Sequence, residues 1–120
     1  MENVVFWYLL MTLIQVYHIF EEIALGSYKF VGSLNKYLIA TSGLISPNFI
    51  LLSLILLNLK IGYILGIIGT FMAMANRVVH LGGYLKTKSY RDTAGAGVFT
   101  GILLAIVGFI VFYQLIRIIR

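Results

Sequence analysis

Most side chains in this sequence that could do chemistry occur in two short groups. His18, Glu21 and Glu22 form the first group, and offsets of three and four residues place them on one face of a helix. Asn76 and His80 belong to the second group and are again four residues apart. Together the groups hold both histidines of the chain and two of its four acidic residues. Both groups lie in otherwise apolar stretches, where ionisable residues are costly and mark function.

These residue types are typical of a metal centre. Two histidines and one carboxylate form the ligand set of catalytic zinc sites and of non-haem iron sites, which keep positions open for water or substrate. We predict a divalent zinc or iron ion held by His18, Glu22 and His80. Glu21 is the alternative carboxylate ligand, or else a general base beside a bound water. The candidate catalytic residues are Glu21, Asn76 and Arg77.

The same residues also fit other functions. Without a metal, a glutamate and an imidazole can shuttle protons to an apolar substrate from the bilayer. A small proton-coupled transporter would use a glutamate of the first span, although such proteins place it near mid-membrane and these two lie at a helix end. His18 and His80 could be axial haem ligands in a four-helix bundle. A non-enzymatic membrane subunit would use all of these residues only for structure.

Each residue has a structural explanation when it is taken alone. A glutamate near a helix end can extend into the headgroups or pair with Lys29, and Arg77 can be a counter-ion for one glutamate. A lone histidine more often makes a hydrogen bond at a helix interface than binds a metal. The hypothesis of a site therefore depends on both groups lying at the same depth.

The composition places the chain in a bilayer. Of its 120 residues, 61% are hydrophobic and 11% are charged, whereas a soluble domain carries about 25% charged residues. Because a membrane-spanning helix needs about 20 apolar residues, the length fits one all-α domain, a polytopic four-helix bundle. The predicted spans are at about 4–25, 44–59, 61–85 and 93–116. The absence of cysteine excludes disulfides and thiolate metal sites.

Local signals set the expected boundaries of the second span. Residues 27–42 mix aromatic residues such as Tyr37 with Lys29 and Lys36, which favours an interfacial segment between the first two spans. Ser46 and Pro47 predict a helix start, with serine as the N-cap and proline at the first helical position. The second span is then short, unless it begins earlier and is kinked at the proline.

Chain direction brings the two polar groups together. The first and third spans cross the membrane in the same direction, so their C-terminal ends share a leaflet. His18 and His80 lie about five and about four residues from those ends, which at about 1.5 Å per residue is a comparable depth. We therefore expect helices one and three to touch.

Asn76 and His80 also lie on a stripe of small residues with steps of three and four, typical of closely packed membrane helices. The stripe contains Gly62, Gly66, Gly69, Ala73, Asn76, His80 and Gly83.

The net charge of +5 is spread over the connections. Such scattered bases favour contacts with anionic lipid and set topology, and no basic face suited to nucleic acid can be drawn. Five bases flank the first and third connections and three lie on the opposite side, which favours both termini outside. The expected partners are the lipid bilayer and a lipid or other apolar small-molecule substrate. A homo-oligomer is left open.

The run from His18 to Glu22 fits the pattern H-x-x-E-E, and with it the chain resembles the HXXEE-domain family of small multi-pass membrane proteins. Asn76 and His80 match a second element of that family, an asparagine followed four residues later by a histidine. The resemblance implies a site at these residues and no particular reaction. Residues 90–95 depart from it, because the family carries a proline-glycine pair after the third span. H-x-x-E-E is also similar to the inverted zincin pattern H-x-x-E-H, for which His80 would supply the third ligand.

Overall fold

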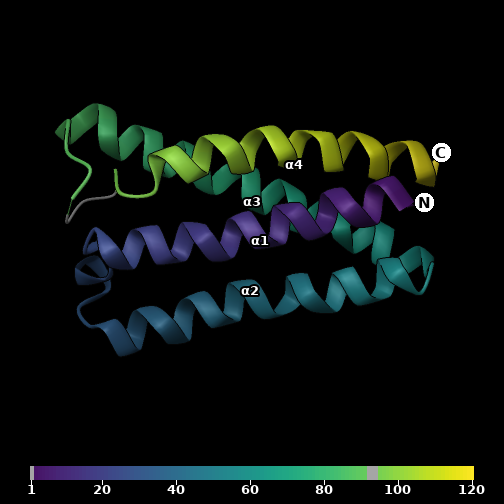
Figure 1. Ribbon diagram of the computed structural model, residues 1–120, viewed down its shortest axis with the longest axis horizontal. Coiled ribbons are helices and arrows are strands. Elements are labelled where there is room, and N and C mark those ends of the chain that lie inside the picture. The colour runs from purple at the N-terminus through teal and green to yellow at the C-terminus, as the bar shows by residue number, and fades with distance from the viewer. Residues whose placement is uncertain (1, 92–94) are drawn as a thin grey trace.

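The computed structural model describes residues 2–91 and 95–120, and this part of the chain is helical, without strands. It contains a short 3-10 helix, η1, at Ser27–Val31. The α-helices are α1 (Glu2–Ala24), α2 (Leu34–Leu56), α3 (Lys60–Thr87) and α4 (Val98–Ile119). The predicted all-α four-helix bundle is confirmed (Figure 1).

All four helices are long and apolar enough to cross a membrane, at 22–28 residues each. Large apolar side chains on the outside of the bundle are exposed, among them Phe20, Val78 and Phe109. In a bilayer these side chains face lipid tails, which cost them nothing. The fold therefore fits an integral multi-pass membrane protein.

The helices form a ring in which chain neighbours are also spatial neighbours. Helix α1 packs against α2 and α4, and α3 packs against the same two helices, so α1 and α3 face each other across the bundle (Figure 1). The expected contact between the first and third spans is therefore made mainly by side chains that cross the interior. The beginning of α1 and the end of α4 lie at one end of the bundle, and the α1–α2 and α3–α4 connections lie at the other.

Helix α2 follows the second of the two predicted possibilities, an earlier start. The short span that begins at Ser46 and Pro47 is wrong, because Pro47 lies inside α2 and the N-cap is Ser33, whose hydroxyl accepts a hydrogen bond from Lys36 N at 3.3 Å. Proline removes one helical hydrogen bond. Ending the helix there would leave several more backbone N–H and C=O groups unpaired, and a membrane offers no water to bind them, so the helix continues. The expected interfacial segment of residues 27–42 is correspondingly reduced to η1 and a short turn.

The other boundaries lie closer to expectation. Helix α3 extends the predicted span by a residue or two at each end. The predicted start of the fourth span at residue 93 lies outside the described residues, and α4 itself begins at Val98 after Gly97, which has a φ of 87°.

The small-residue stripe of α3 faces the interior, as predicted for much of its length. A Cβ atom on Gly66 would lie 3.3 Å from Ile55 of α2, 3.3 Å from Leu115 of α4 and 3.5 Å from Tyr8 of α1. Gly66 thus marks the point where all four helices meet. Close approach of backbones there depends on the missing side chain.

We expect Gly62→Ala to destabilise the bundle. A Cβ atom on Gly62 would lie 2.7 Å from the Leu54 Cβ and 2.8 Å from the Leu54 carbonyl carbon, so α2 and α3 would have to move apart. The expected cost is about 1–3 kcal/mol, measured as a lower thermal unfolding midpoint in detergent micelles. Gly82→Ala is the matched control, because nothing lies within 4 Å of its added Cβ. Equal midpoints for the two variants would contradict this packing.

Candidate metal centre

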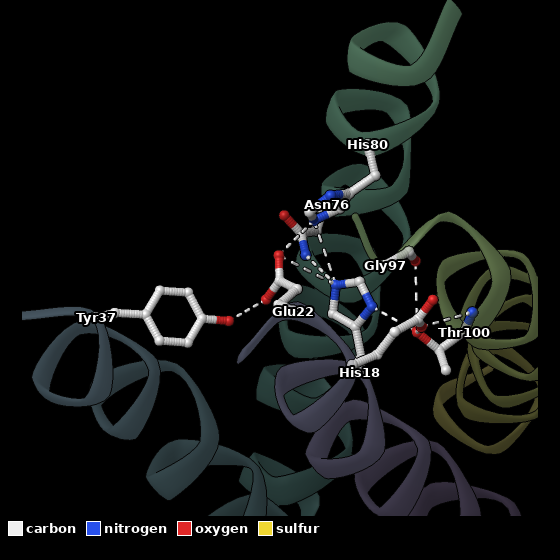
Figure 2. Close-up of polar contacts among 8 residues, drawn as sticks. His18, Glu22, Tyr37, Asn76, His80, Gly97 and Thr100 are labelled. Carbon is white, nitrogen blue, oxygen red and sulfur yellow. Dashed lines mark hydrogen bonds and ion pairs between the residues drawn. The ribbon is translucent and has the colours of Figure 1, made fainter. Parts of the chain in front are cut away.

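The two polar groups meet at the end of the bundle that holds the α1–α2 and α3–α4 connections. His18 and His80 lie in the C-terminal halves of α1 and α3. Residues from the first turns of α2 and α4 lie beside them (Figure 2). His18 and His80 therefore lie at the same level of the bundle.

The three predicted metal ligands lie together. His18 Nε2 is 3.3 Å from His80 Nε2, and Glu22 Oε1 is 3.1 Å from His80 Nε2 and 3.8 Å from His18 Nε2. All three residues are buried. The two imidazole rings are nearly perpendicular, at 83°, with their Nε2 atoms directed at each other (Figure 2).

These distances fit one divalent cation. Four tetrahedral ligands at about 2.0–2.2 Å from zinc are about 3.3–3.6 Å apart, close to the three separations observed. His18, Glu22 and His80 could therefore hold one ion with small side-chain shifts and leave a position open. The same atoms can otherwise form hydrogen bonds, with an imidazole N–H donating to the glutamate.

The hydrogen-bond partners of His18 favour one tautomer of its ring. The Thr100 hydroxyl donates to Glu21 Oε2, so its oxygen accepts from His18 Nδ1, 2.7 Å away. A proton on Nδ1 leaves the lone pair on Nε2, the atom that faces His80. Asn76 Nδ2, 3.3 Å from His18 Nε2, is placed to donate to that lone pair. A carboxylate that orients a histidine through its other nitrogen is the usual support of a metal-ligating imidazole.

Glu21 lies on the Nδ1 side of His18, next to α4. Besides the Thr100 hydroxyl, its carboxylate accepts from Thr100 N at 3.3 Å. Thr100 is the third residue of α4, so Glu21 satisfies a free N–H of the first turn and lies at the positive end of the helix dipole. The structure thus places Glu21 behind His18 and not beside the three candidate ligand atoms.

Glu22 is held from the opposite side by α2. Its Oε2 accepts a hydrogen bond from the buried Tyr37 hydroxyl, while Oε1 faces the histidines (Figure 2). Tyr37 and Thr100 were not among the predicted site residues. No pattern in the sequence pairs Thr100 with His18 and Glu21, or Tyr37 with Glu22.

The two remaining predicted residues, Asn76 and Arg77, lie in different places. Asn76 joins the cluster through its contact with His18. Arg77 lies on a different face of α3, where it lines a shallow depression with Ile102, Ile106 and Phe109 of α4. Among the predicted catalytic residues, Asn76 alone is next to a candidate ligand atom in the described part of the chain.

Gly97 allows His18 to reach α4. A Cβ atom there would lie 2.4 Å from His18 Cε1, and the residue has a φ of 87°, which favours glycine. The imidazole therefore packs directly on the backbone that begins α4.

The geometry does not suit haem. A porphyrin ring bound by two axial histidines must lie between the imidazoles, but here the Nε2 atoms are 3.3 Å apart and the Glu22 carboxylate contacts one of them.

No family model, curated protein or solved structure matches this chain.

We expect nitrogen NMR of histidine-labelled protein to show His18 as the Nδ1–H tautomer when it is metal-free at about pH 8, where an ordinary imidazole is neutral. Thr100→Val removes the hydroxyl at nearly constant volume and should shift His18 toward a mixture of tautomers. A His80→Gln variant assigns the signals.

Thr70→Val is the matched control for this measurement. The Thr70 hydroxyl is also buried but donates to Gly66 O of its own helix at 2.7 Å, far from the histidines. If wild-type His18 carried its proton on Nε2, the proposed contact from His18 to Thr100 would be wrong.

Proposed function

We propose that this chain is a membrane-embedded enzyme with a divalent metal centre held by His18 Nε2, Glu22 Oε1 and His80 Nε2. The observation that carries the proposal is the meeting of these three buried atoms, separated by 3.1–3.8 Å, from two helices on opposite sides of the bundle. Zinc and ferrous iron both suit two imidazoles and one carboxylate.

The surroundings of the cluster support a metal. An ionised carboxylate is costly in a bilayer unless it is paired, and the two positive charges of a divalent cation would more than neutralise Glu22. The lone pair of His18 and the Glu22 carboxylate are both acceptors aimed at one space. Two of the three ligands are in turn held by a further residue, His18 by Thr100 and Glu22 by Tyr37, which is the arrangement that orients metal ligands.

A bound ion would supply a Lewis acid at its open position, which suits hydrolysis or another reaction at a polar bond of a lipid or apolar small molecule. The neighbouring residues of the chain orient the proposed ligands. Tyr37 fixes the Glu22 carboxylate, and Glu21 fixes His18 through Thr100, so Glu21 is a positioning residue in this proposal. Asn76, with an amide beside His18, is the residue best placed to contact a substrate.

The decisive experiment compares Glu21→Gln with Glu22→Gln, two adjacent substitutions of identical chemistry. Protein purified without chelator should carry about one zinc or iron ion per chain by elemental analysis, as one three-residue ligand set implies. Glu21→Gln should keep that stoichiometry with about 10–100-fold weaker affinity, typical of lost support for a ligand. Glu22→Gln removes a ligand and should lose more, as should His80→Ala.

Thermal unfolding of each variant without metal separates loss of binding from loss of fold. Metal-free wild-type protein that takes up neither zinc nor ferrous iron on titration would overturn the proposal. Equal affinities for the wild type and Glu22→Gln would overturn the ligand assignment.

A further inference from the structure

A cavity of about 500 Å³ lies beside the ligand cluster, between α1, α2 and α3. Its volume falls in the range of about 300–1,000 Å³ that is usual for small-molecule sites. Its wall is mostly apolar with three amide side chains, and it includes Gln15, Pro47, Asn48, Leu51, Met72 and Asn76.

The cavity opens toward lipid. Every residue that lines it belongs to one of three helices long enough to cross a membrane, at levels away from the helix ends. Met72 is 59% exposed and Val79 is 61% exposed at its edge. A molecule that enters here therefore comes sideways from the acyl-chain region of a bilayer.

The polar groups in the wall are only partly used. Asn48 accepts from the Tyr8 hydroxyl at 3.2 Å and donates to Gln15 Oε1 at 2.9 Å. The Gln15 amide N–H groups then have no partner among the described residues. Hydrogen-bonding groups without partners at membrane depth are costly unless a ligand satisfies them.

Asn76 connects the cavity to the ligand cluster. It lines the cavity and its Nδ2 lies 3.3 Å from His18 Nε2. Gln15 lies three residues before His18, on the same face of α1. A ligand in the cavity can thus place one polar group between Gln15 and Asn76, next to the proposed metal.

We propose that this cavity binds the acyl chain of a single-chain ester or amide lipid, whose carbonyl oxygen accepts from Gln15 beside the ligand cluster. This inference rests on the proposed function and names its substrate class. The apolar wall suits one chain, the free amide donors suit a carbonyl, and the opening to lipid suits a molecule dissolved in the bilayer.

The test uses the full chain in liposomes and a fatty acid methyl ester that carries a photoreactive diazirine in its chain. Mapping of labelled peptides should place the label near Leu44 and Met72, and unlabelled ester should compete. Gly43→Leu should lower the competed labelling by about 10-fold or more, since added methylenes in an apolar pocket cost binding by such factors. No atom lies within 4 Å of a Cβ added at Gly43, so the variant should fold.

Gly82→Leu is the matched control, because Gly82 is an exposed helical glycine with equally open space and does not line the cavity. A second variant, Gln15→Leu, should remove the preference for the ester over an alkane probe with the same diazirine. Equal labelling of the Gly43 and Gly82 variants would overturn the inference. Labelling that unlabelled ester does not compete would also overturn it, since the probe would then react with an exposed surface and not from a binding site.

Elemental analysis of the same preparations keeps the two proposals apart. Competed labelling of protein that binds no metal would support the cavity and overturn the metal centre. A metal-loaded protein without competed labelling would overturn the cavity and leave the metal centre standing.

Discussion

The contact between His18 and His80 across the bundle is the interaction on which the rest of this structure depends. Helices α1 and α3 lie opposite each other, and their imidazole Nε2 atoms approach to 3.3 Å in the interior. A membrane interior offers no water to either ring, so every polar atom in this region needs a protein partner or an ion. Tyr37 of α2 and Thr100 of α4 supply such partners. Side chains from all four helices thus meet around this diagonal contact.

The backbone conformation at Gly97 also makes the position of His18 possible. Gly97 gives His18 room against the start of α4, where any Cβ atom would clash with the ring. Glu21 then closes the first turn of that helix by accepting from Thr100 N, and its negative charge lies at the positive end of the α4 dipole. The connection between α3 and α4 therefore ends where a histidine, a glutamate and a helix terminus satisfy one another.

The meeting of His18, Glu22 and His80 could be predicted from sequence because it depends on two regular quantities. Helical spacing puts His18 and Glu22 on one face, and chain direction puts His80 at the same depth. Tyr37 and Thr100 could not be predicted, since their contacts join residues 15 and 82 positions apart and leave no local pattern. The signal at Pro47 favoured a helix start because proline commonly opens helices. Helix α2 nevertheless continues through Pro47, since inside a bilayer the loss of one helical hydrogen bond costs less than a segment of unpaired backbone.

The spacing of H-x-x-E-E gains a physical meaning from these contacts. Consecutive residues of a helix point about 100° apart, so Glu21 and Glu22 cannot serve the same partner. Glu22, four residues after His18, faces the Nε2 side of the ring and reaches His80. Glu21, three residues after it, faces α4 and acts on the Nδ1 side through Thr100. Each imidazole nitrogen of His18 thus has its own carboxylate, one beside the proposed metal and one that sets the tautomer needed to bind it.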